Sequence, residues 1–134
     1  ATAHHHPTWL VTTADALERA GSRAVELREH GVTLLALDDP TLAPRTVLTS
    51  LAQHGITRLL VEAGGTISTA YWNAGLVETL HWYRGAVVLG NAGQPALGRL
   101  ETSLEHAPRL ILRQRVPFAT DCYEEFALPS CLPD

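Results

Sequence analysis

The stretch Arg58-Leu-Leu-Val-Glu-Ala-Gly-Gly-Thr66 says most about how this chain folds. Its apolar run, residues 59–61, predicts a buried strand that ends at the carboxylate of Glu62. Gly64 and Gly65 lack Cβ atoms, so they can take positive φ and let backbone amides approach a ligand closely. Thr66 is the predicted N-cap of a helix over residues 67–74, whose positive dipole end, equivalent to about half a charge, faces the glycines. A strand, two glycines and a helix start form the geometry that binds phosphate or pyrophosphate. A tight β–α turn without a ligand is the alternative reading.

The residues before this stretch alternate between strand and helix patterns. An apolar, β-branched run predicts each strand, and apolar residues on one face predict each helix. The predicted elements are a strand at 9–13, a helix at 14–30 interrupted at Gly21-Ser22, a strand at 32–37 and a helix at 44–54. Asp38-Asp39-Pro40 is predicted to be a loop. The order β-α-β-α-β-α calls for right-handed crossovers and a parallel sheet.

The pattern changes after Gly75, which is predicted to end the helix. Residues 77–89 form one long strand-like run, and a loop rich in Gly, Asn and Pro follows at 90–98. Residues 110–116 and 123–128 predict two more strands, which must be antiparallel because so few residues join them. The sequence therefore predicts an α/β fold with a mixed sheet. Residues 8–134 are expected to form a single domain, and residues 1–7 a disordered tail or cloning remnant.

Composition excludes several classes of partner. The chain has 134 residues, 46% of them apolar and 18% charged, which is typical of a globular domain. A formal net charge of −4 argues against nucleic acid or an anionic membrane as the partner. No run approaches the roughly 18 apolar residues of a membrane span, so we expect a cytoplasmic protein. Two cysteines, Cys122 and Cys131, are too few for a secreted disulfide scaffold. Three consecutive histidines, residues 4–6, lack the spacing of zinc ligands, and no metal site is predicted.

Several separated motifs resemble one family. Val61-Glu-Ala-Gly-Gly-Thr-Ile67, Ala74-Gly-Leu-Val-Glu-Thr-Leu80 and Val88-Leu-Gly90 follow one another in this chain. They resemble V-E-[AG]-G-x-T-L, A-G-L-V-D-E-L and L-L-G in the C-terminal reductase domain of the bifunctional riboflavin-biosynthesis deaminase/reductase. The resemblance covers about residues 8–128. It implies a dihydrofolate-reductase-like fold and an NADPH-dependent oxidoreductase that reduces a ribosylaminopyrimidine phosphate to its ribitylamino form.

The resemblance also implies roles for individual residues. The backbone amides of Gly64, Gly65 and Thr66 would bind the cofactor pyrophosphate, with Ile67 opening the helix above it. Glu62, at a strand's carboxyl end, would lie near the nicotinamide and the substrate sugar and act as the catalytic carboxylate. The hydroxyls of Thr12 and Thr13 are candidates to bind the adenosine 2′-phosphate. Alternatively, Gly64 and Gly65 only form a turn, and Glu62 caps a backbone turn or is simply solvated. Thr12 and Thr13 are then ordinary strand residues.

The chain also departs from the family pattern. About eighty further residues, with an S-x-D-G stretch, are expected to precede this region in the family's reductase domain, and the zinc deaminase signature does not occur. Arg84-Gly85 replaces the usual Ala-Pro. A central strand is therefore expected to be missing, which leaves an apolar sheet edge that a second copy or the missing half would cover. We expect a homodimer or a larger assembly. We expect this piece alone not to turn over substrate. Another dihydrofolate-reductase-like reductase, or a non-catalytic remnant that binds a nucleotide or serves assembly, remains an alternative.

Overall fold

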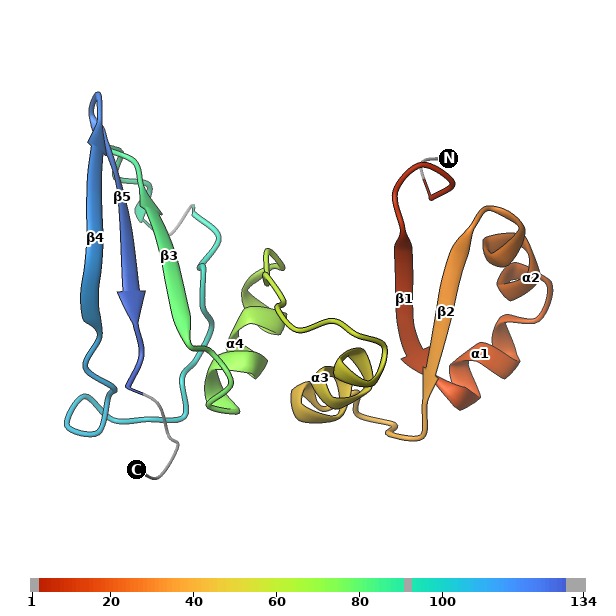
Figure 1. Ribbon diagram of the computed structural model, residues 1–134. Coiled ribbons are helices and arrows are strands. Elements are labelled where there is room, and N and C mark those ends of the chain that lie inside the picture. The colour runs from red at the N-terminus through yellow and green to blue at the C-terminus, as the bar shows by residue number, and fades with distance from the viewer. Residues whose placement is uncertain (1–2, 91–92, 130–134) are drawn as a thin grey trace. The chain divides into compact units, whose positions relative to one another are not determined.

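The computed structural model describes residues 3–90 and 93–129. The chain divides into two compact units, Ala1–Leu59 and Leu60–Asp134. Figure 1 shows a pair of strands with its helices in the first unit and a separate sheet in the second. Each unit is described here by itself.

Two parallel strands form the sheet of the first unit. β1 (Thr8–Thr13) pairs with β2 (Val32–Leu37), in a register that runs from Thr8 opposite Val32 to Thr13 opposite Leu37. Parallel strands need a crossover between them, and α1 (Ala14–Ala20) and α2 (Ser22–Glu29) provide it. The predicted order of strand, interrupted helix and strand is confirmed.

Gly21 causes the predicted interruption of the first helix. Its φ of +49° lies in the region that L-residues avoid, so the chain turns between α1 and α2 without a steric penalty. A second glycine, Gly31, has φ +82° and directs the chain from α2 into β2.

The next helix, α3 (Pro44–Gln53), begins and ends as its sequence predicts. Pro44 occupies the first helical turn, where a missing N–H costs nothing. At the other end Gly55 has φ +85°, its amide donates to the Ala52 carbonyl at 3.0 Å, and the Ile56 amide donates to the Leu51 carbonyl at 3.1 Å. These two bonds are the Schellman arrangement.

Helices lie on both sides of the β1–β2 pair. Figure 1 shows α1 and α2 on one side of the pair and α3 on the other. On the α3 side, the Trp9 ring of β1 meets the His54 ring edge-on, with ring centroids 5.3 Å apart. This contact anchors the end of α3 to the strand.

The second unit contains one helix and an antiparallel sheet. The helix is α4 (Gly65–Asn73), and the sheet has the order β3-β5-β4, made of β3 (Thr79–Arg84), β4 (Ile111–Phe118) and β5 (Asp121–Ala127). The last two strands form the predicted antiparallel hairpin. Parallel and antiparallel pairing are both present, as predicted, but they occur in separate sheets, one in each unit.

The predicted long strand at residues 77–89 is wrong in its extent. β3 ends at Arg84, and residues 85–89 are not paired. Gly85 follows immediately, and the Ala86 amide donates to the Asp121 carboxylate at 3.3 Å instead of to a neighbouring strand. A side-chain acceptor therefore takes the place of the ladder bond and ends the strand.

A loop is tied to α4 by three polar contacts. The Gly98 amide donates to the Thr69 hydroxyl at 2.6 Å, and Asn73 bonds the Arg99 carbonyl and the Glu101 amide through its side chain. The predicted end of this helix is confirmed, since Gly75 has φ +66° and the Leu76 amide reaches back to the Tyr71 carbonyl.

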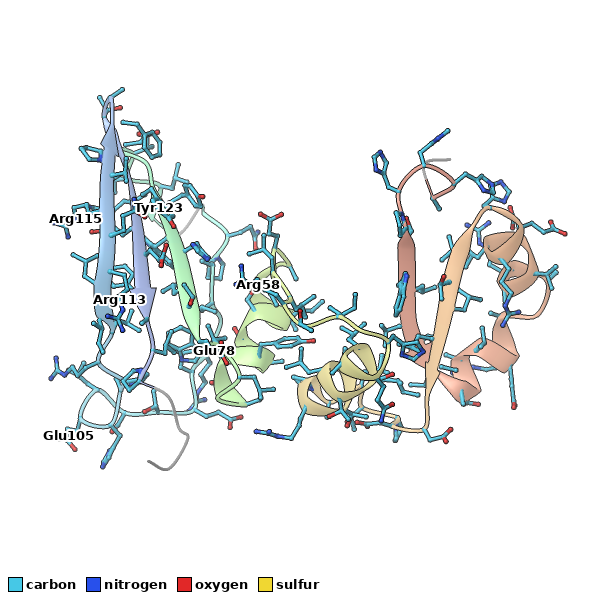
Figure 2. The ribbon with its side chains drawn as sticks, in the orientation of Figure 1. Arg58, Glu78, Glu105, Arg113, Arg115 and Tyr123 are labelled. Carbon is cyan, nitrogen blue, oxygen red and sulfur yellow. The ribbon has the colours of Figure 1, made fainter. Side chains whose placement is uncertain are left out.

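One buried carboxylate joins the three strands of the sheet. Glu124 of β5 is 6% exposed, and Arg115 of β4 donates to its Oε1 through Nη2 at 2.6 Å and Nε at 2.8 Å. Arg84 of β3 approaches Oε2 at 3.9 Å. Figure 2 labels Arg115 on β4 and Tyr123 on the neighbouring β5. A buried charge needs such partners, so the two arginines account for the burial of Glu124.

Three sequence expectations concern the ends and surroundings of the chain. Residues 3–5 form a turn, and the His4 ring lies near Gly31. The expected tail at residues 1–7 and the expected single domain at residues 8–134 stay predictions. Cys122 is a free thiol, and Cys131 lies outside the described residues. Within residues 3–90 and 93–129, no helix has the length and apolar character needed to cross a membrane.

Candidate functional site

The glycine loop, residues 64–66, starts α4 in a way that differs from the prediction. The N-cap is Gly64, not Thr66, and no side chain caps the helix. Gly64 has φ −62°, and Gly65 is not among the glycines with positive φ. The prediction that the two glycines adopt positive φ is therefore wrong. The helix begins at Gly65 because the Gly64 carbonyl already accepts from the amides of Ile67 and Ser68, at 3.1 and 3.2 Å.

The amides at this helix start have no protein acceptor among the described residues. The first amides of a helix have no partner inside it. In the part of the chain that the structure describes, the amides of Gly64, Gly65 and Thr66 donate to no backbone carbonyl outside the helix and to no side chain. They therefore leave three donors at the positive end of a nine-residue helix.

The surroundings of Gly64 and Gly65 differ. A Cβ on Gly65 would lie 2.7 Å from the Pro95 carbonyl oxygen, so the close approach of the 93–98 loop requires a glycine there. A Cβ on Gly64 would meet no atom within 4 Å, and its φ suits any residue. Protein packing thus explains Gly65 and leaves the space at Gly64 open, as a phosphate that approaches the backbone would need.

Glu62 precedes the loop without the predicted strand. Residues 58–62 have no strand conformation, and the prediction of a strand there is wrong. A strand is held by hydrogen bonds to a neighbouring strand, and among the described residues none pairs with this segment. The Glu62 side chain is exposed and forms no ion pair or hydrogen bond within the described ranges. Just after it, the Ser68 hydroxyl donates to the Ala63 carbonyl at 2.9 Å and fixes the approach to the helix.

Thr12 and Thr13 end β1 in the first unit, as predicted. Thr13 is also the N-cap of α1, because its Oγ1 accepts from the Ala16 amide at 3.1 Å. This role in helix capping was not predicted, although a threonine before an Asp-containing first turn is a typical cap signal. The cap uses an oxygen lone pair and leaves the hydroxyl hydrogen of Thr13 free to donate.

A cavity of about 350 Å³ lies at the carboxyl ends of β1 and β2. Parallel strands place their ligands at this edge. Thr13 lines the cavity, and Thr12 does not; the other lining residues are Ala14, Asp15, Arg19, Leu37, Asp38 and Pro40. Arg19 forms an ion pair with Asp15 one helical turn away. The sequence gives no signal for Arg19 at this edge, because this residue lies on α1 and not at the end of a strand.

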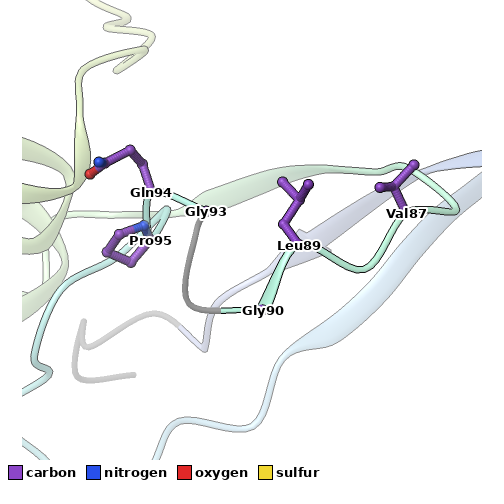
Figure 3. Close-up of a pocket in the computed structure, with 6 residues that line it drawn as sticks. All are labelled: Val87, Leu89, Gly90, Gly93, Gln94 and Pro95. Atoms are coloured by element: carbon purple, nitrogen blue, oxygen red, sulfur yellow. The ribbon is translucent and has the colours of Figure 1, made fainter.

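A second hollow lies in the second unit. It has a volume of about 590 Å³ and is lined by Val87, Leu89, Gly90, Gly93, Gln94 and Pro95 (Figure 3). Pro95 also packs against Gly65, so the hollow adjoins the start of α4. Val87 and Leu89 are 72% and 66% exposed, which leaves an apolar wall open beside the glycine loop.

Within residues 3–90 and 93–129, no group of three or more His, Cys, Asp or Glu side chains is arranged to hold a metal ion. The site features are therefore the glycine loop with its adjoining hollow and, in the other unit, the cavity beside Thr13.

Comparison with known proteins gives these features a family. The model of the RibD C-terminal domain matches residues 1–122. The chain belongs to the RibD C-terminal domain family. It is 28% identical over 117 residues to the riboflavin biosynthesis protein RibD of Bacillus amyloliquefaciens and 29% identical over 106 residues to that of Chlamydia trachomatis. The aligned parts cover 86% and 75% of this chain.

Two solved structures share the fold of this chain. RibD of Acinetobacter baumannii superposes with a TM-score of 0.68 at 24% identity, over 78% of this chain and 29% of that protein. A pyrimidine reductase-like protein of Corynebacterium diphtheriae gives a TM-score of 0.71 at 17% identity, over 90% of this chain and half of that protein. The predicted α/β fold of the dihydrofolate-reductase-like type is thereby confirmed. The chain spans 31% and 28% of the two curated relatives, so it corresponds to a part of each.

Proposed function

We propose that this chain is the cofactor-binding part of an NADPH-dependent oxidoreductase of riboflavin biosynthesis. The reaction proposed is the reduction of a ribosylaminopyrimidine phosphate to its ribitylamino form. Membership of the RibD C-terminal domain family supports the pathway and the reaction class. The observation that carries the proposal is the start of α4, where amides that have no acceptor within residues 3–90 and 93–129 border the open space at Gly64.

The residues present fit a pyrophosphate at this point. The amides of Gly64, Gly65 and Thr66 would donate to its oxygens, and the dipole of α4 adds about half a positive charge. Ile67, 54% exposed, would lie beside the bound cofactor in the next helical position. No lysine or arginine is needed for this kind of binding.

The cavity beside Thr13 supports NADPH over NADH. The hydroxyl hydrogen of Thr13 is free to donate to a 2′-phosphate, and Arg19, which forms an ion pair with Asp15, lines the same cavity. Arginine suits phosphate because its planar fork presents parallel donors. Thr12 precedes Thr13 at the end of β1 and does not line the cavity.

Glu62 is the proposed catalytic carboxylate. When bound, the reduced nicotinamide would supply a hydride to the opened sugar. The chain's own contribution would be orientation and charge, and Glu62 would hold a proton or stabilise positive charge at the reacting nitrogen. The exposed, unpaired state of Glu62 in the described structure leaves it available for that role.

The substitution Glu62→Gln tests this role. In the full-length protein that contains this chain, we expect the reduction rate to fall by about 100-fold or more, within the range of general acid–base contributions. NADPH affinity should change less than about threefold, because the glycine loop is intact. The readouts are single-turnover oxidation of NADPH at 340 nm and a fluorescence titration of the cofactor. An unchanged reduction rate would remove Glu62 from the mechanism.

We further propose a cytoplasmic location and a pyrimidine ribose phosphate as the small-molecule partner. The net charge of −4 supports a protein that does not bind nucleic acid or membrane surfaces. Two cysteines in the chain are too few for the disulfide scaffold of a small secreted domain.

A further inference from the structure

The cavity at the carboxyl ends of β1 and β2 carries charges of both signs. Its volume of about 350 Å³ lies within the range of small-molecule sites, roughly 300–1,000 Å³. The charged residues that line it are Asp15, Arg19 and Asp38, so two carboxylates accompany one guanidinium. A phosphate in this cavity therefore meets both attraction and repulsion, and individual side chains set the balance between them.

The guanidinium of Arg19 is engaged at one nitrogen. Its Nη1 donates to Oδ2 of Asp15, one helical turn away on α1. A guanidinium has five N–H donors, and this bond uses one of them. Within residues 3–90 and 93–129, Nη2 and Nε of Arg19 form no hydrogen bond or ion pair. This side of Arg19 can still donate to a phosphate while Asp15 stays attached.

The two carboxylates of the cavity differ in their contacts. Asp38 directly follows β2 and forms no ion pair with Arg19. Asp15 forms that ion pair, so its negative charge lies directly beside the group proposed to bind phosphate. Asp15 is therefore the carboxylate whose removal should change phosphate binding most.

Asp15 has two opposing effects on a phosphate held by Arg19. Its carboxylate orients the guanidinium, which favours binding, and its charge repels the phosphate. The paired side chains are 69% and 73% exposed, and an exposed pair at this spacing changes an equilibrium constant by about twofold. A dianionic phosphate about 6 Å from a carboxylate in water is disfavoured by about 3- to 10-fold, depending on salt. Repulsion is the larger effect.

We propose that Asp15 reduces the preference of this chain for NADPH over NADH, because it repels the 2′-phosphate beside the Arg19 guanidinium. The inference rests on the proposed function, in which this phosphate is bound beside Thr13 and Arg19. NADH carries a hydroxyl in place of the 2′-phosphate and has no charge at that position. Asp15 therefore opposes NADPH selectively and is a specificity-determining residue.

Asp15→Asn tests the inference, because it removes the charge and keeps the shape of the side chain. Fluorescence titrations of the whole chain with NADPH and with NADH give the two dissociation constants at low salt. We expect the variant to bind NADPH about 3- to 10-fold more tightly than the wild type, and NADH with an affinity changed by less than about twofold. At about 0.5 M salt the gain for NADPH should shrink to about twofold or less, because screening removes the repulsion.

Glu18→Gln is the matched control. Glu18 is exposed on the same helix, does not line the cavity and forms no ion pair within the described ranges. Its loss of charge should leave the ratio of the two dissociation constants unchanged. Arg19→Met keeps the side-chain stem and removes the guanidinium, so it should weaken the binding of NADPH and not that of NADH.

The outcomes separate this inference from the proposed function. An unchanged ratio in Asp15→Asn, or the same gain in Glu18→Gln, would overturn the inference. A selective loss of NADPH affinity in Asp15→Asn would also overturn it, since Asp15 would then act by orienting Arg19. In these cases the wild-type chain still binds cofactor, and the proposed function stands. A wild-type chain that binds neither NADPH nor NADH would overturn the proposed function and the inference together.

Discussion

Two adjacent glycines at the start of α4 have different surroundings. Gly65 is needed because the Pro95 carbonyl occupies the place of a Cβ, whereas Gly64 faces open space. The sequence shows two identical residues and predicts the same conformational reason for both. The structure shows a packing requirement at Gly65 and open space at Gly64, and neither residue has positive φ.

Alanine at each glycine should separate these requirements. Gly65→Ala should lower the free energy of unfolding by about 1–3 kcal/mol, because the new methyl group is forced against the backbone at Pro95. Gly64→Ala should change it by less than about 1 kcal/mol. Urea denaturation of the two variants measures both quantities, and an equal loss in the two would contradict the distinction.

Asp39 provides a test of electrostatics at the residue scale. The Thr41 hydroxyl donates to its carboxylate at 2.7 Å, and hydrogen bonds from Thr41 and Thr46 lower the pKa of Asp39 to about 2. The amides of Thr41 and Ala43 also donate to it, so the carboxylate holds the turn before α3. The predicted loop at residues 38–40 is confirmed, but this turn-holding role was not predicted.

The sign of the effect follows from the lowered pKa. The ionised form is favoured in the folded state, so its stabilisation is fully present above the ordinary aspartate pKa of about 3.9. It is lost as the pH falls from about 4 towards the folded pKa of about 2. Asp39→Asn should lower stability at neutral pH and flatten the stability profile between these two values. Thermal melts from pH 2 to pH 7 measure this, and parallel profiles for the variant and the wild type would contradict it.

At the scale of elements, the β4–β5 hairpin carries a strained turn. Phe118 pairs with Asp121, so Ala119 and Thr120 form a two-residue loop. Ala119 has φ +52°, a conformation that costs an L-residue about 1–2 kcal/mol. Turns of this kind favour glycine at such a position.

Ala119→Gly should therefore stabilise the chain by about 0.5–1 kcal/mol, after the entropy cost of glycine is subtracted. Thr120→Gly is the matched control, because Thr120 does not have positive φ, and it should be neutral or destabilising. Chemical denaturation gives both values. A destabilised Ala119→Gly variant would show that the turn is not strained.

Helices and strands differ in how far the sequence predicts them. Helix ends depend on local signals, so Pro44, Gly55 and Gly75 predict the ends of α3 and α4 within a residue or two. The prediction of Thr66 as the N-cap of α4 is wrong, because Gly64 is the N-cap. A strand depends on a distant partner that sequence periodicity does not reveal. The apolar run at residues 58–62 has the composition of a strand and no partner among the described residues.

At the scale of the whole molecule, family motifs carry more information than periodicity. The spacing of the motifs around Glu62, Ala74 and Gly90 predicts the RibD C-terminal domain family, and the match over residues 1–122 confirms it. Neither family motifs nor periodicity predict how side chains are arranged around a site. The position of Arg19 at the cavity depends on where α1 lies. The contacts of the Tyr123 hydroxyl with His81 and Glu125 depend on the register of the strands. The roles assigned to Thr12, Thr13, Glu62 and residues 64–67 stay predictions.

We propose that the amides of residues 64–66 bind the pyrophosphate of NADPH. This claim is tested most directly by following the backbone amide NMR signals of the whole chain during a titration with NADPH. We predict saturable downfield shifts at Gly64, Gly65 and Thr66, and an affinity at least about 10-fold weaker in Gly64→Ala, whose methyl group would fill the phosphate space. Saturable binding that leaves these three amides unmoved, or no saturable binding at all, would contradict the account.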